Sequence, residues 1–278
     1  MKIKIKLLGI LCFLLSFNLN SGAQQITSPN GNLILNVNSE NGSVLYDLSY
    51  KGKNVILPSK LGVEADGFSM SGDFSIKGVS NKSVDETWKP VWGQYSVISN
   101  NYNEIAVELV RSGSKAREMI VRFRLFNDGL GFRYEFPEQK NLNYFTLLNE
   151  ITEFRLSGDH VAFCIPGDYD TNEFSYTTAK ISEISKGMDI AARNKGYESK
   201  AEGYTVQTPL MLKSADGIYI NIHEAALVNY AGMLLNVDDK NFILSAHLTP
   251  DKLGKKGYLQ APCNSPCRTV IVSDDARD

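Results

Sequence analysis

Residues 166–174, PGDYDTNEF, form the segment of the sequence most suited to binding chemistry, because three carboxylates lie within six residues. The side chains of Asp168, Asp170 and Glu173 repel one another unless a cation or hydrogen-bond donors compensate their charge. Together with the Asn172 amide they offer hard oxygen atoms, which Ca²⁺ prefers as ligands. The alternative is an Asx-rich turn whose side chains bind their own backbone.

The pair His223-Glu224 is the second candidate. It begins like the zinc motif H-E-x-x-H, but Leu227 stands where the second histidine must be. The whole sequence has 3 His, so a zinc site is not expected. The pair closes the apolar run 218–222, and a solvated rim of a sheet is the simpler interpretation, with a ligand-facing role as the alternative.

The only two tryptophans, Trp88 and Trp92, lie in the segment ETWKPVWG at residues 86–93. Tryptophan faces can stack on sugar rings, but tryptophan more often packs in a core or an interface. Core or interface packing is therefore the favoured interpretation of this segment.

These groups must be positioned by short runs in which apolar and polar residues alternate, as in β-strands. Asn-Gly or Asp-Gly pairs, which suit tight hairpins, separate many of these runs. This pattern predicts an all-β fold, a large β-super-sandwich of two antiparallel sheets, with no internal domain boundary. Helical spacing of apolar residues predicts one short helix at 181–194, followed by a polar loop at 195–203. The clearest strand candidates are residues 32–38, 43–50, 54–57, 104–110, 119–126, 131–136, 161–165, 217–222, 233–237, 242–248 and 269–272.

The composition of the chain excludes some classes of function. The chain has 278 residues, 43% of them hydrophobic, so it can build a packed core. Its 29 basic and 31 acidic residues give a formal charge of −2, which leaves no basic excess for binding nucleic acid.

Residues 1–23 have the pattern of a secretory signal, with three lysines, an apolar stretch at 7–17 and a small-residue cleavage site ending at Ala23. The mature domain would therefore span residues 24–278, and no later segment is apolar enough to cross a membrane. It keeps Cys164, Cys263 and Cys267, an odd number, so at least one thiol has no partner within the chain.

Several blocks together closely resemble the N-terminal domain of glycoside hydrolase family 97, which includes the starch-utilisation α-glucosidase of Bacteroides. They follow the family order across nearly the whole mature chain, and the long central block and GDYDTNE are the most specific. The blocks are TSPNGNL (27–33), DETWKPVWG (85–93), YNEIAVEL (102–109), VRFRLFNDGLGFRYEFPEQ (121–139), IPGDYDTNEF (165–174), DGIYINIHEAAL (216–227) and RTVIVSDDAR (268–277).

The resemblance implies a galactose-mutarotase-like super-sandwich followed, in family members, by a catalytic (β/α)8 barrel and a small β domain. It implies a periplasmic, calcium-dependent, exo-acting enzyme that hydrolyses α-linked gluco-oligosaccharides, or else galactosides, with catalytic carboxylates on the barrel and none here. The family's glutamate that helps hold Ca²⁺ corresponds to Glu173. We expect Asp168, Asp170 and Asn172 to shape the loop, and His223 and Glu224 to face the barrel.

A calcium ion needs about six to eight oxygen ligands and Glu173 supplies at most two, so no tight site is expected in this chain alone. Cys164 and Cys267 stand where relatives commonly carry tryptophan, and a bond between them is one hypothesis. A freestanding carbohydrate-binding or scaffold module remains the alternative function. A mutarotase-like epimerase would need His223 and Glu173 or Glu224 around one sugar.

Overall fold

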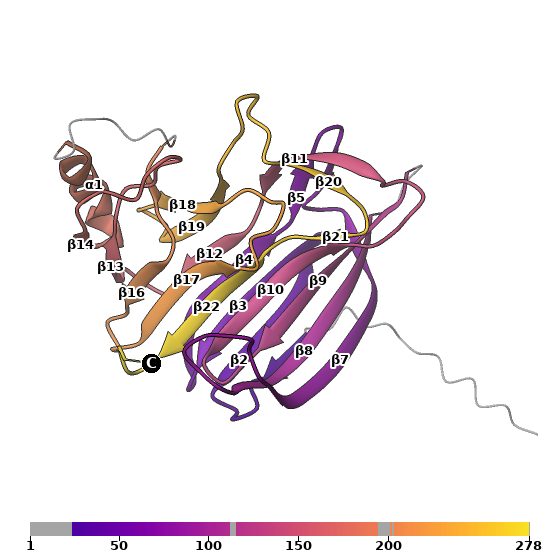
Figure 1. The fold of residues 1–278 in the computed structure, drawn as a ribbon, viewed down its shortest axis with the longest axis horizontal. Coiled ribbons are helices and arrows are strands. Elements are labelled where there is room, and N and C mark those ends of the chain that lie inside the picture. Colours follow the sequence, from indigo (N-terminus) through magenta and orange to yellow (C-terminus); the bar gives the residue numbers. More distant parts are fainter. Residues whose placement is uncertain (1–23, 112–114, 194–200, 202, 278) are drawn as a thin grey trace, which may run out of the picture.

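Two large antiparallel sheets face each other and enclose one hydrophobic core, and a small sheet extends one end (Figure 1). The computed structural model describes residues 24–277 except 112–114, 194–200 and 202. The expected signal peptide, and most of the polar loop expected at 195–203, lie outside the described residues. The predicted all-β sandwich of two large antiparallel sheets is confirmed, whereas the third sheet was not predicted.

The order of the strands within each sheet departs from their order along the chain. From one edge to the other, the 8-stranded sheet contains β1 (Gln24–Thr27), β2 (Leu33–Glu40), β3 (Ser43–Tyr50), β4 (Lys53–Leu61), β12 (Glu153–Leu156), β19 (Ile243–Leu248), β18 (Met233–Asp238) and β15 (Thr205–Val206). The 10-stranded sheet contains β14 (Thr177–Lys180), β13 (Val161–Cys164), β16 (Leu210–Lys213), β17 (Tyr219–Ala225), β22 (Cys267–Ser273), β10 (Gly129–Phe136), β9 (Arg117–Leu125), β8 (Ile98–Arg111) and β7 (Phe74–Trp88), with β21 (Cys263–Asn264) pairing with β10. The 4-stranded sheet contains β20 (Gly257–Gln260), β11 (Tyr144–Glu150), β5 (Val63–Ala65) and β6 (Phe68–Met70).

Alternating burial explains why the two large sheets pair face to face. Every second residue of β3 is buried, and β9 and β10 repeat this pattern. Side chains of successive strand residues point to opposite faces, so the buried residues gather between the sheets. The rings of Tyr46 and Phe132 approach to 5.1 Å between centroids, and Phe123 and Phe154 extend this aromatic cluster.

Glycines serve two different purposes in the predicted turns. Asn41 and Gly42 have φ of 50° and 76°, as the tight β2–β3 hairpin requires. Gly129 has no positive φ. A Cβ there would lie 2.5 Å from the Val270 carbonyl oxygen, so the close approach of β22 to β10 explains this glycine.

The predicted helix is present as a 3-10 turn, Ile181–Glu183, followed by α1, Ile184–Arg193. It lies beside β14 at one edge of the 10-stranded sheet, and β7 forms the opposite edge (Figure 1). No helix among the described residues has the length and apolar character that a membrane crossing requires.

The hypothesis of a bond between Cys164 and Cys267 is wrong, because β16 and β17 separate their strands in the sheet. Neighbouring strands lie about 4.8 Å apart, far too wide in sum for a disulfide. Cys164, Cys263 and Cys267 are all free thiols. Burial raises the pKa of Cys164 to about 12, so this thiol is unreactive at neutral pH.

Candidate functional site

The carboxylate-rich loop 166–174 lies between β13 and β14 of the 10-stranded sheet and contacts the 8-stranded sheet. It follows β13 of the 10-stranded sheet, and Pro166 forms a bridge with Val206 of the 8-stranded sheet. The Gly167 amide donates to the Thr205 carbonyl at 2.8 Å. A Cβ on Gly167 would lie 2.3 Å from the Thr205 hydroxyl, so only glycine permits this approach.

Asp168 is the organising residue of the loop. Its buried carboxylate accepts hydrogen bonds from the amides of Asp170 at 2.8 Å and Thr171 at 3.2 Å. The Gln207 amide donates to the backbone carbonyls of Asp168 and Thr171. These contacts are those of an Asx turn held by the residue that follows β15.

Glu173 follows this turn and is exposed. Its backbone amide donates to the Thr171 hydroxyl at 3.1 Å. Among the described residues, no hydrogen bond or ion pair involves the Glu173 carboxylate. The loop therefore presents this carboxylate to solvent from a backbone held in place by several hydrogen bonds.

Tyr169 fixes the loop to the 8-stranded sheet. Its hydroxyl lies 2.7 Å from Nε2 of His247 on β19, and the two ring planes are nearly parallel with centroids 5.8 Å apart. This contact was not predicted, since no local pattern relates residues 78 positions apart in the sequence.

Glu224 is not a solvated rim residue, and that expectation was wrong. Its side chain is 9% exposed and forms an ion pair with Arg268 of β22, and it accepts a hydrogen bond from the Met233 amide at 3.0 Å. Glu224 lies opposite Arg268 in the antiparallel register. Glu224 continues the two-residue period of the buried residues Ile220 and Ile222, so it lies on the same, inward face of β17.

Arg268 and Glu150 form the buried centre of this charge network. We call Arg268, Glu150 and Glu224 the inner network. Both side chains are 0% exposed, and the guanidinium binds the Glu150 carboxylate at 2.8 and 2.7 Å. Tyr230 and Thr152 donate further hydrogen bonds to the same carboxylate. Burial alone would raise the pKa of Glu150, but the Arg268 charge and these hydrogen bonds outweigh it and hold the pKa below its ordinary value.

Sequence reasoning missed the inner network, although a signal for it existed. Arg268 shares the buried alternation of Val270 and Val272, and a charged residue at such a position needs a buried partner. Sequence alone does not say which carboxylate provides it.

A cavity of about 290 Å³ joins the two candidate motifs. It brings together Asp168, Asp170, Asn172, His223 and Glu224, whereas Glu173 is not among its lining residues. The Nδ1 atom of His223 is buried and has no hydrogen-bond partner among the described residues, which leaves an unsatisfied polar atom in a residue that lines the cavity.

The calcium donor set is incomplete within the described residues. They contain no group of three or more His, Cys, Asp or Glu side chains that could hold a metal ion. The exposed Glu173 carboxylate fits one ligand of such an ion, and the remaining oxygens would have to come from elsewhere.

The tip of the β7–β8 hairpin is a second surface of interest. Trp88 and Trp92 are 50% and 89% exposed, so core packing is the wrong interpretation for both. Val91, Tyr95 and Val97 are also exposed on this tip. A cluster of exposed large apolar side chains marks a surface for a partner.

Comparison with known proteins finds similarity to part of several glycoside hydrolases. The family model described as "Glycosyl-hydrolase 97 N-terminal" matches residues 26–278. A retaining alpha-galactosidase of Bacteroides thetaiotaomicron is 26% identical over 301 residues, covering 97% of this chain and 41% of that protein.

Solved structures give the same result. A glycoside hydrolase family 97 enzyme from Pseudoalteromonas sp. strain K8, in complex with acarbose, is 32% identical with a TM-score of 0.77, covering 91% of this chain and 36% of that one. A beta-arabinopyranosidase, 19% identical with a TM-score of 0.74, covers 90% of this chain and 40% of its own, and shares the fold. The chain thus spans about two fifths of the relatives it matches.

Proposed function

The chain belongs to the glycosyl-hydrolase 97 N-terminal family, and from this premise we propose that it is the supporting domain of a calcium-dependent, exo-acting α-glycosidase. The observation that carries the proposal is the fastened loop 166–174, which holds Glu173 outward beside a polar cavity. The reaction itself belongs to a catalytic barrel in the same polypeptide.

The carboxylates of the cavity support a structural role for this chain. Glycoside hydrolysis needs two carboxyl groups that flank the scissile bond. Asp168 binds the amides of its own loop, and Glu224 pairs with Arg268, so neither is available as acid, base or nucleophile. What remains for substrate is the exposed edge of the loop, at Asn172 and Glu173.

Glu173 is the residue we assign to calcium. The ion would add a positive charge and a set of oxygen contacts at the edge of the substrate site. The role of this chain is to hold the carboxylate in position, through the turn of Asp168 and the clamp of Gln207. Because the described residues offer no complete donor set, the other ligands would come from the barrel.

The hairpin tip around Trp92 supplies a docking contact for that barrel. Its side chains are too exposed to stabilise the sandwich itself. Family relatives are more than twice as long as this chain, so a large further portion is available to cover the tip.

Two substrate classes have support. The Pseudoalteromonas enzyme, at 32% identity, is described with acarbose, which favours α-glucosides for this protein. The retaining alpha-galactosidase, at 26% identity, favours α-galactosides. We propose α-gluco-oligosaccharides as the substrate, and export to the periplasm through the signal pattern at residues 1–23.

A domain exchange tests the assignment of Glu173. Residues 24–278 replace the corresponding domain of the Pseudoalteromonas enzyme, and hydrolysis of p-nitrophenyl α-glucoside is measured against calcium concentration. We expect Glu173→Gln to shift half-activation to at least tenfold higher calcium, because one carboxylate ligand is lost. Glu183→Gln is the matched control, since Glu183 is another exposed glutamate, and it should leave the calcium curve unchanged.

Unchanged calcium dependence in a folded Glu173→Gln chimera would remove the metal role. Tight binding of sugar by the unfused chain at the cavity of His223 would instead favour the freestanding binding module.

A further inference from the structure

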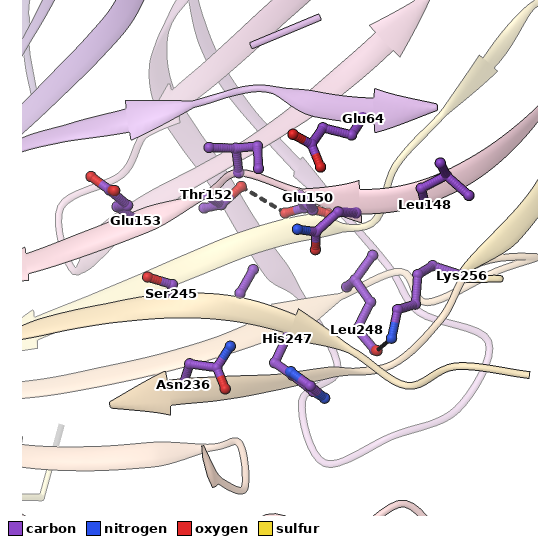
Figure 2. A pocket seen from close by; sticks show the side chains of 13 residues that line it. Glu64, Leu148, Glu150, Thr152, Glu153, Asn236, Ser245, His247, Leu248 and Lys256 are labelled. Atoms are coloured by element: carbon purple, nitrogen blue, oxygen red, sulfur yellow. Dashed lines mark hydrogen bonds between the residues drawn. The ribbon is translucent and has the colours of Figure 1, made fainter. Parts of the chain in front are cut away.

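A second and larger cavity, of about 540 Å³, lies where the 4-stranded sheet meets the 8-stranded sheet. The chain passes from one sheet to the other here, as β11 ends at Glu150 and β12 begins at Glu153. The pairing of β11 with β5 shifts register between Leu147 and Asn149, so the strand pairing is irregular at this corner. Figure 2 shows side chains from the strands on both sides converging on the space between them.

Four polar side chains of this cavity have no partner within the described residues. Glu64, Asn149, Asn236 and Ser245 come from β5, β11, β18 and β19, and all four are half-buried. No hydrogen bond or ion pair in the described part of the chain involves their side chains. Half-buried amides and carboxylates that lack protein partners bind water or a ligand.

The polar groups at the floor of the cavity are buried and already hydrogen-bonded within the protein. Glu150 and Thr152 are buried there, and the Glu150 carboxylate already accepts from Arg268, Thr152 and Tyr230. The inner network therefore sets the shape of the floor without offering an acceptor to a ligand.

The remaining groups favour a neutral ligand with many hydroxyls. The Asn149 and Asn236 amides and the Ser245 hydroxyl each donate and accept. Glu64 and Glu153 add carboxylates that oppose an anion, and Lys256 adds one positive charge. The described residues hold no group of three His, Cys, Asp or Glu side chains placed to bind a metal, so a metal ion is disfavoured.

We propose that this cavity is a secondary binding site for a pyranose unit, separate from the cavity beside Glu173. Its volume lies within the range of about 300–1,000 Å³ that small-molecule sites occupy. Its lining contains no Phe, Tyr or Trp among the described residues, so recognition depends on hydrogen bonds and is weak, with Kd on the order of 1 mM. The choice of gluco-oligosaccharides as ligand rests on the proposed function.

Titration of the purified chain with maltose and panose, followed by NMR in the presence of chelator, tests the site. We expect the side-chain amide resonances of Asn149 and Asn236 to shift on binding. Asn236→Leu should weaken binding at least tenfold, because it removes an amide, unpartnered within the described residues, from the lining of the cavity. Asn172→Leu, a matched change at the other cavity, should leave the affinity unchanged.

Absence of binding by the folded wild-type chain at about 50 mM sugar, well above the expected Kd, overturns the proposal. It is also overturned if Asn172→Leu abolishes binding and Asn236→Leu does not. Because the wild-type amide resonances report directly, the test stands even if Asn236→Leu fails to fold. Chelator keeps the result independent of the calcium role of Glu173, which the domain exchange tests separately.

Discussion

Two charge networks of similar composition lie in very different surroundings. The inner network joins Arg268 to Glu150 and Glu224, and it links the 10-stranded sheet to the 4-stranded sheet. The outer network joins Arg122 to Glu104 and Glu135, on three adjacent strands of one sheet.

Each glutamate of the outer network has a second partner, Arg124 for Glu104 and Arg133 for Glu135. The outer arginines keep about 24–39% side-chain exposure, whereas Arg268 has 0%. From this difference we expect burial and redundancy, rather than the number of ion pairs, to decide how much stability is lost when an arginine is removed. The inner network also underlies both cavities, since Glu150 lines one and Glu224 the other.

Arg268→Met should have the largest effect, a loss of about 3–5 kcal/mol in the free energy of unfolding, because Glu150 and Glu224 are left as uncompensated buried charges. Denaturant unfolding of the purified chain measures this loss. A loss below about 1 kcal/mol would mean that burial does not make the inner network more important for stability than the outer one.

The pH dependence of stability should differ in sign between wild type and Arg268→Met. The pKa of Glu150 lies below its ordinary value of 4.5, so its contribution is present above that value and is lost as pH falls through the folded pKa. Without Arg268, burial raises the pKa of Glu150, and the variant should lose stability as pH rises from 4.5. Unfolding curves at several pH values give both slopes, and parallel slopes would refute the role of the inner pair.

Arg122→Met should cost only about 1 kcal/mol, because Glu104 and Glu135 each keep another arginine. This variant should retain the acid sensitivity of wild type, since the pKa of both glutamates would remain lowered by Arg124 and Arg133. Denaturant unfolding measures this cost as well. A loss as large as that of Arg268→Met would contradict the expected difference between the two networks.

Salt should produce the smallest difference. Raising the ionic strength to about 1 M shortens the screening length to about 3 Å, which weakens exposed ion pairs far more than buried ones. We expect the cost of Arg122→Met to shrink by a few tenths of a kcal/mol and that of Arg268→Met to stay constant. Equal salt dependence of the two costs would show that water reaches the inner pair.

The sheets were predictable because their signal is local. Alternation in residues 43–50 predicted β3 with its observed bounds, and Ile181, Ile184 and Met188 predicted the helix. The 15-residue strand β7 was missed, since its exposed, polar sequence lacks a buried alternation.

The candidate site was predictable only in part. The motifs at 166–174 and 223–224 were found from their composition, and the structure brings both to one cavity. The partners Gln207, His247 and Arg268 were not found, because they reach the site through sheet topology rather than sequence proximity.

The most direct test of the central claim is hydrolysis of p-nitrophenyl α-glucoside and α-galactoside by the purified 278-residue chain, with calcium and with chelator. If the chain is a supporting domain, we expect no turnover with calcium or with chelator. Calcium-dependent turnover that Glu173→Gln abolishes would contradict the account, because the sandwich itself would then carry a catalytic site.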